Sequence, residues 1–203
     1  MERRLIQRTD ERHVHTPASP LRLLAVSLRN SAMSSSPITS IRDLVQQLLD
    51  ERDITKYAGI LERYAVPGSD LEPYIRWNSR HYTRNCIVRN EDLELLVICY
   101  EPGQRTSIHD YDSQTAWIHV VQGEVLEERF RLTATGEVKL QREVDLRTGM
   151  VEMMASGNSI HRFTNQGPGR AVTINLYAKP LSKWRVYDEG TGLPGLVPSS
   201  PSR

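Results

Sequence analysis

Two short segments of the chain each combine a turn-forming glycine with a histidine that a strand could present to a metal ion. The first segment, residues 103–111, contains His109 and Tyr111, and the second, residues 157–165, contains His161. His109 and Tyr111 are two residues apart, so their side chains face the same way on an extended chain. His161 could complete a three-residue face on a metal and leave other coordination positions open for a substrate. The sequence therefore predicts a metal site with His109, Tyr111 and His161 as ligands.

The tyrosine in this set decides the charge of the predicted site. The reference pKa of a tyrosine phenol is about 10, and a bound divalent cation can lower it enough to give phenolate at neutral pH. A phenolate in place of a neutral imidazole adds negative charge, which makes Ni(II) or copper compatible with the site besides iron. The alternative is that Tyr111 only fills space and that the metal is weakly held or absent.

A third histidine, His119, follows the first segment closely. Strand alternation over residues 115–121 groups His119 with Trp117, whereas Ala116 and Ile118 would face the interior. We therefore predict that His119 is a surface histidine and not a ligand of the metal.

Helices are predicted ahead of these segments. Ser40 with Asp43 three residues later resembles a helix-capping pair. Apolar residues recur at helical spacing after it, namely Ile41, Leu44, Val45, Leu48 and Leu49. This pattern predicts an amphipathic helix that ends near residue 53. A second helix over residues 54–65 is stopped by Pro67 and Gly68, and a short helical turn follows.

Beyond residue 80 the pattern changes to short β-prone runs separated by turn residues. The predicted strands are residues 82–88, 93–100, 115–121, 125–132, 138–144, 150–154, 162–165 and 171–177. Many short strands after a helical start predict a sandwich or jelly-roll barrel that carries N-terminal α-helices. Trp184 and Arg185 are expected to pack at the mouth of this barrel.

Composition narrows the class of protein and its partners. The 203 residues suffice for one domain with a substantial core. Lys and Arg together number 26 and Asp and Glu 25, so there is no electrostatic reason to expect nucleic acid or an anionic membrane as a partner. No apolar run approaches the roughly 20 residues that a membrane helix needs. We expect neither class of partner.

The domain boundaries and the compartment follow from local composition. We expect residues 1–36 to be a disordered leader or an over-extended gene start, residues 37–190 to form the domain, and residues 191–203 to be a flexible tail. The N-terminal segment does not resemble a secretory signal. Cys86 and Cys99 lie in apolar runs and form neither a disulfide pattern nor a zinc pattern. These features predict a cytoplasmic protein with buried thiols.

Four motifs in this order resemble those of the cysteine dioxygenase family in the cupin superfamily. They are residues 82–85 (YTRN), residues 102–123, residues 159–162 (SIHR) and residues 175–177 (NLY). The resemblance extends over about half the chain and implies an all-β cupin barrel with N-terminal α-helices. It also implies that Arg84, with Tyr82 beside it, holds the carboxylate of cysteine. Tyr177 would be the catalytic phenol, which donates a proton or hydrogen bond to oxygen.

The chain departs from the family pattern at three positions. The family binds ferrous iron through three histidines, and Tyr111 stands where the second should be. Ala116 occupies the position of a cysteine in animal enzymes, so no cysteine–tyrosine crosslink to Tyr177 can form. Asn175 replaces a histidine that hydrogen-bonds within the pocket, and we expect it to contact the substrate.

The resulting interpretation is a metal-dependent oxygenase that oxidises the sulfur of L-cysteine with dioxygen. One divalent transition metal is expected, Fe(II) by resemblance and Ni(II) or another because of Tyr111. The product would be cysteine sulfinate or, with the altered ligand set, a further-oxidised or rearranged species such as a sulfonamide. The alternative is a catalytically degenerate cupin that binds a small thiol or amino acid as a sensor or accessory protein. Another thiol, such as a mercaptopropionate, would keep the mechanism and change only the groups that meet Arg84 and Asn175.

Overall fold

The computed structural model describes residues 36–65, 68–111, 114–155, 159–181, 183–189 and 194–198. The chain divides into two units, Met1–Ser34 and Ser35–Arg203, and every described residue belongs to the second unit. The predicted leader therefore lies outside the described residues, apart from Ser36. Within the described ranges, no helix combines the length and the apolar character that crossing a membrane requires.

Helices occupy the N-terminal part of this unit, as the sequence predicts. Their bounds are α1 (Ile41–Asp50), η1 (Ile54–Lys56), α2 (Tyr57–Glu62), α3 (Gly68–Leu71) and η2 (Glu72–Tyr74), where η marks a 3₁₀ helix. α1 begins at the predicted cap, since the Ser40 hydroxyl accepts a hydrogen bond from the Asp43 backbone N–H at 3.0 Å. α2 ends earlier than predicted, because the Ala65 N–H bonds to the Ile38 carbonyl at 3.0 Å instead of continuing the helix.

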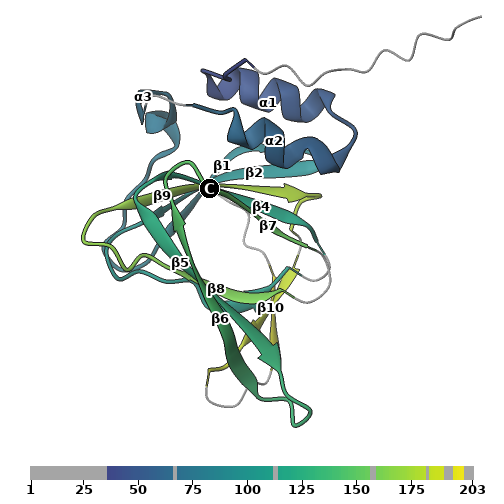
Figure 1. Cartoon of the computed structure of the whole chain (residues 1–203), viewed down its shortest axis with the longest axis vertical. Coiled ribbons are helices and arrows are strands. Elements are labelled where there is room, and N and C mark those ends of the chain that lie inside the picture. Colours follow the sequence, from purple (N-terminus) through teal and green to yellow (C-terminus); the bar gives the residue numbers. More distant parts are fainter. Residues whose placement is uncertain are drawn as a thin grey trace, which may run out of the picture. The chain divides into compact units, whose positions relative to one another are not determined.

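Strands make up the rest of the described unit. Their bounds are β1 (Thr83–Arg89), β2 (Leu93–Tyr100), β3 (Ile108–Asp110), β4 (Ala116–Gln122), β5 (Glu124–Leu132), β6 (Val138–Arg147), β7 (Val151–Met154), β8 (Ile160–Thr164), β9 (Ala171–Ala178), β10 (Lys183–Tyr187) and β11 (Pro194–Pro198). One sheet has the order β1-β2-β9-β4-β7 and the other β11-β10-β3-β8-β5-β6. Figure 1 shows the two sheets facing each other, with the helices over the outer face of the first. This is the predicted jelly-roll barrel of a cupin with N-terminal helices.

Three strands were not predicted. β3 has only three residues, and β10 alternates Trp184 and Val186 with charged neighbours over only five residues, so each gives a weak strand signal. β11 lies within residues 191–203, which we expected to be a flexible tail. It pairs with β10 in antiparallel register and so extends the edge of the second sheet. Backbone hydrogen bonds to a neighbour, and not the local sequence, account for this strand.

Strand β4 separates two apolar cores because its side chains alternate. Trp117 packs beneath the helices, with its ring 5.3 Å from that of Tyr57, whereas Ala116 and Ile118 belong to the core inside the barrel. His119 faces outward with Trp117, as the alternation predicts, but it is only 3% exposed. The prediction of a surface histidine is therefore wrong. Helix α2 contacts β4 and covers this face of the sheet.

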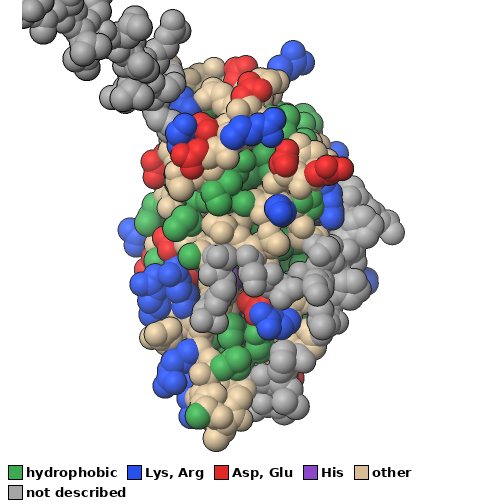
Figure 2. All heavy atoms as spheres, turned by 90° about the vertical axis from the view of Figure 1, so that its right-hand side faces the viewer, with side chains coloured by type: hydrophobic (Ala, Val, Ile, Leu, Met, Phe, Trp, Pro, Cys, Tyr) green, Lys and Arg blue, Asp and Glu red, His purple; other side chains and the backbone are tan. Residues whose placement is uncertain are grey.

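The surface carries charges of both signs. Figure 2 shows Lys and Arg side chains beside Asp and Glu side chains over the helical part of one face. Lys56 and Glu51 form an ion pair of 3.1 Å, and Arg52 and Asp92 one of 3.4 Å. Such surface pairs contribute little to stability. The mixture agrees with the near-zero net charge of the sequence.

Candidate metal centre

The three residues predicted as metal ligands lie together inside the barrel. His109 is on β3 and faces His161 on β8, its direct cross-strand partner. Their ring centroids are 4.5 Å apart. The ring of Tyr111, just after β3, is 4.6 Å from that of His161 and 5.2 Å from that of His109. The structure thus brings two imidazoles and one phenol into a single cluster.

Both imidazoles are held in the same tautomer. Nδ1 of His109 lies 2.8 Å from the Ser107 carbonyl oxygen, and Nδ1 of His161 lies 2.6 Å from that of Ser159. A carbonyl can only accept, so each Nδ1 carries the proton and each Nε2 keeps a lone pair. Nε2 of His161 is buried and has no hydrogen-bond partner among the described residues. A buried lone pair without a partner is an arrangement that a metal ion would satisfy.

Burial keeps these histidines neutral. It lowers the pKa of His109 to about 4, despite the opposing effect of the Ser107 carbonyl. Burial, and then the neighbouring His109, lowers the pKa of His161 well below its usual value. Metal binding requires a neutral imidazole, so neither residue has to release a proton at neutral pH.

Tyr111 is also buried, with the opposite consequence for coordination. Burial, followed by the neighbouring Tyr177 phenol, raises the pKa of the Tyr111 phenol well above its usual value. A phenol held neutral in this way becomes a strong ligand only if the metal itself lowers the pKa. Among the described residues, no cluster of three His, Cys, Asp or Glu side chains could hold a metal. Tyr111 lies beside the two imidazoles, at the place where a third such side chain would complete a cluster.

Asp110 separates the two ligand positions on β3 but turns away from the ring cluster. Its carboxylate accepts hydrogen bonds from Arg185 Nε at 3.0 Å and from the Tyr187 hydroxyl at 2.7 Å. Both partners lie on β10, the neighbour of β3. Asp110 thus joins β3 to β10.

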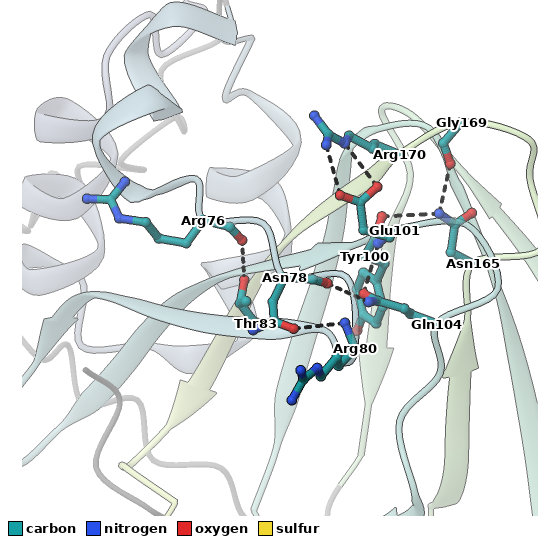
Figure 3. Close-up of polar contacts among 10 residues, drawn as sticks. All are labelled: Arg76, Asn78, Arg80, Thr83, Tyr100, Glu101, Gln104, Asn165, Gly169 and Arg170. Carbon is teal, nitrogen blue, oxygen red and sulfur yellow. Dashed lines mark hydrogen bonds and ion pairs between the residues drawn. The ribbon is translucent and has the colours of Figure 1, made fainter.

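The two sequence motifs are tied together by hydrogen bonds at their turns (Figure 3). Nδ2 of Asn165, the last residue of the second motif, donates to the carbonyls of Tyr100 at 3.2 Å and Gly169 at 2.8 Å. The Asn165 backbone N–H bonds to the Gln104 carbonyl at 2.9 Å. Nε2 of Gln104 in turn donates to the Asn78 carbonyl at 2.7 Å. These bonds fix the turn that leads into His109 against the strand that carries His161.

A cavity of about 200 Å³ adjoins the ring cluster formed by His109, Tyr111 and His161. The other predicted site residues line this cavity. Its lining includes His109, Tyr111, Tyr82, Arg84, Asn175, Tyr177 and Trp184. Tyr82 stacks on Tyr100, with ring centroids 5.6 Å apart. The Nε of Arg84 is buried and has no hydrogen-bond partner among the described residues. A buried guanidinium N–H without an acceptor indicates a position for an anionic group.

Asn175 and Tyr177 are on β9 and both point into this cavity. Oδ1 of Asn175 accepts a hydrogen bond from the Thr173 hydroxyl at 2.7 Å, and its Nδ2 lies 3.5 Å from the Tyr177 hydroxyl. The rings of Tyr177 and Tyr111 are 5.2 Å apart, edge to face. The phenol of Tyr177 is therefore placed between the amide of Asn175 and the ring cluster.

One family model matches most of the chain, and this match identifies the family. The family described as cysteine dioxygenase type I matches residues 24–190 of this chain. The chain belongs to that family. Cysteine dioxygenase type 1 of Homo sapiens is 25% identical over 147 residues, which are 70% of this chain and 74% of the relative. The enzyme of Danio rerio is 24% identical over 164 residues, with 75% and 81% covered.

Solved structures with a related fold are less similar. A conserved protein with a double-stranded β-helix domain from Klebsiella pneumoniae has a TM-score of 0.49 and 17% identity, over 58% of this chain and 94% of that one. A cupin superfamily protein from Desulfitobacterium hafniense has a TM-score of 0.42 and 15% identity, over 52% and 84% of the two chains.

Membership in the cysteine dioxygenase family indicates a metal-dependent cupin oxygenase with a non-haem divalent metal. The donor set of this chain fits such a metal. His109 and His161 are neutral, share one tautomer and lie side by side, and the free Nε2 of His161 is buried within the cluster. The phenol of Tyr111 lies in the same cluster, with its ring 4.6 Å from that of His161.

The sequence left two features of the site without a defined role. The Ser107 and Ser159 carbonyls fix the histidine tautomers, and backbone groups leave no signal in residue types. Trp184 was expected at the barrel mouth, but its contact with Arg84 was not, although the guanidinium carbon lies 4.5 Å from the centroid of its ring. The signal that could have found this contact is alternation in β10, where Trp184 and Val186 line the cavity.

Proposed function

We propose that this cupin oxidises the thiol sulfur of L-cysteine with dioxygen. The observation that supports the proposal is one cavity lined both by His109 and Tyr111 of the ring cluster and by Arg84 with its unpartnered N–H. L-cysteine has a thiol and an amine that suit a transition metal and a carboxylate that suits a guanidinium. The groups of this substrate thus match both kinds of residue in the cavity.

Each residue of the cavity has a defined task in this reaction. His109, Tyr111 and His161 would hold a divalent metal, Fe(II) by family membership or Ni(II) because of the phenol. This metal would bind the thiol and the amine and would supply the redox chemistry that dioxygen requires. Arg84 binds the carboxylate and fixes the orientation of the substrate, which lowers the entropic cost of reaction. The Tyr177 hydroxyl donates a hydrogen bond or a proton to oxygen that is being transferred to sulfur.

Two products are compatible with these residues. Addition of both oxygen atoms of dioxygen to the thiol gives cysteine sulfinate. Chelation also places the nitrogen and the sulfur of cysteine side by side, so a further-oxidised or rearranged product such as a sulfonamide is the alternative. The phenol of Tyr111 and the amide of Asn175, which replace two family histidines, are the reason for considering it.

The test is a product analysis with purified protein that is supplied with Fe(II), Ni(II) or no metal. L-cysteine is added in air, and products are followed by mass spectrometry. We expect metal-dependent consumption, with a mass that distinguishes sulfinate from a rearranged species. Survival of cysteine with every metal would rule out this substrate.

A second arm of the test examines the role of Arg84. Arg84→Gln should lower kcat/KM for L-cysteine by about 10- to 100-fold, because hydrogen bonds to charged groups contribute about 1.5–3 kcal/mol. For cysteamine, which lacks the carboxylate, the same variant should have the kcat/KM of the wild-type protein. Arg76→Gln, at an exposed position outside the cavity, is the matched control. Equal losses with both substrates would show that Arg84 does not bind the carboxylate.

A catalytically degenerate cupin that binds a small thiol or amino acid is the second candidate function. The replacement of a family histidine by Tyr111 favours it, because a phenol that stays neutral is a weak ligand. Stoichiometric binding of L-cysteine without any consumption, with every metal tried, would establish this function in place of the oxygenase.

A further inference from the structure

Strand β10 presents two different faces to its surroundings. Trp184 and Val186 line the cavity, whereas Arg185 and Tyr187 on the alternate face bond to the Asp110 carboxylate. The position of Trp184 is therefore fixed by contacts made on the opposite side of its own strand. An indole held in this way forms part of the wall of the cavity.

The Arg84 guanidinium lies over the indole ring of Trp184. The guanidinium carbon lies 4.5 Å from the ring centroid, within the range of a cation–π contact. A ring above the guanidinium plane leaves the in-plane N–H groups available for a bidentate anion. The buried Nε of Arg84 is such a group, and it has no acceptor among the described residues.

A second arginine of the same chain shows this arrangement with its anion in place. The Arg170 guanidinium carbon lies 4.4 Å from the ring centroid of Trp77. The Arg170 guanidinium also binds the Glu101 carboxylate through two nitrogens, at 3.0 and 2.8 Å (Figure 3). An arginine stacked on tryptophan thus holds a carboxylate in a bidentate manner here. In the Arg84–Trp184 pair, the arginine lines the cavity, and its buried Nε has no acceptor among the described residues, whereas Arg170 Nε has the Glu101 carboxylate.

We propose that Trp184 is a specificity-determining residue, which orients Arg84 for a free carboxylate and closes the cavity beyond it. The inference rests on the proposed function and names the class of substrate. The cavity of about 200 Å³ accommodates a small thiol that ends in a carboxylate. A thiol extended at that carboxylate by an amide-linked residue loses one oxygen of the bidentate contact and meets the indole. The protein therefore selects free amino acids over cysteine peptides.

The test compares L-cysteine with L-cysteinylglycine on the metal-loaded protein. Trp184→Ala should raise KM for L-cysteine about tenfold, the size expected of a lost cation–π contact, with a much smaller change in kcat. It should raise kcat/KM for L-cysteinylglycine relative to L-cysteine by at least about tenfold. Trp184→Phe, which keeps an aromatic face, should restore most of the selectivity.

Trp77→Ala is the matched control, because it removes the same kind of contact from an arginine that does not line the cavity. It should leave the ratio of the two substrates unchanged. Thermal melting and circular dichroism identify any variant that fails to fold, and Trp184→Phe then provides the comparison. An unchanged ratio in folded Trp184→Ala would overturn the inference while leaving the oxygenase proposal intact.

The equilibrium affinities of the two compounds, measured by anaerobic calorimetry, separate the two proposals. If the wild-type protein consumes neither compound, the oxygenase proposal fails. A binding preference for L-cysteine that is lost in Trp184→Ala would still support the role of Trp184. Equal binding of the two compounds by the wild-type protein, or binding of neither, would overturn that role.

Discussion

His161 and His119 are both buried histidines, but they face opposite sides of the barrel wall. They are 0% and 3% exposed, each has one ring nitrogen without a partner among the described residues, and burial is the largest cause of the lowered pKa of each. His161 has its Nδ1 fixed by a carbonyl and two further donor rings within 4.6 Å. His119 has the ring of Tyr64 at 6.5 Å and lies beneath the helices.

The comparison shows which observations distinguish a candidate metal site from a buried core histidine. Burial, a perturbed pKa and an unpartnered nitrogen occur on both sides of the wall, so none of them is sufficient. A fixed tautomer and the convergence of several donors occur only at His161 of the two. Perturbed histidines also arise where packing alone has buried a ring.

The largest effect is expected from His161→Ala. This change removes a proposed ligand, so metal content should fall from stoichiometric to near zero and turnover by more than about 100-fold, because even the outer partners of a ligand contribute about 10- to 100-fold. Elemental analysis and the product assay measure both quantities. His119→Leu is the matched control and should retain metal and turnover. Equal losses in the two variants would remove the distinction between the histidines.

A smaller effect on metal binding and turnover is expected from Tyr111→His, which gives the cluster inside the barrel a third imidazole. The substitution replaces the proposed phenolate ligand by a neutral imidazole, so the ratio of the affinities for Ni(II) and Fe(II) should change. The product should shift toward plain cysteine sulfinate. Competition between the two metals and mass spectrometry of the product provide the measurements. If neither metal preference nor product changes, Tyr111 does not coordinate the metal.

Much of the fold could be predicted because its signals are local. The buried run that forms β2 was predicted with both ends correct, and the cap at Ser40 located the start of α1. β3, β10 and β11 depend on pairing with neighbours in the sheet, which a single strand does not show. His119 was placed on the correct face of β4, but the helices that bury it lie far away in the sequence.

The candidate site could be predicted as a set of residue types but not as a geometry. Motif spacing was enough to select His109, Tyr111 and His161. The carbonyls that fix the tautomers and the stacking of Trp184 on Arg84 depend on backbone atoms and on the register of β10. Whether a histidine is a ligand or a core residue depends on this three-dimensional context.

His119→Leu is expected to have the smallest effect on metal binding and turnover. Its effect on the free energy of unfolding should be measurable. Burial lowers the pKa of His119 to about 4, while its value in the unfolded chain is about 6.5. The unfolded chain therefore binds the proton first as the pH falls, so the stability that the neutral ring contributes is complete above pH 6.5 and is lost between about pH 6.5 and pH 4. At pH 5 the loss amounts to about 2 kcal/mol.

His119→Leu should remove this part of the pH dependence and leave stability at pH 8 unchanged or higher, because it replaces a buried nitrogen without a partner by a methyl group. Urea unfolding of both proteins at pH 5 and pH 8 measures the difference. The exposed His81, replaced by Gln, is the control and should reproduce the wild-type difference. If His119→Leu also reproduces it, His119 is protonated within the folded protein. His119 would then not be a neutral core ring without a partner, and the contrast between His119 and His161 would fail.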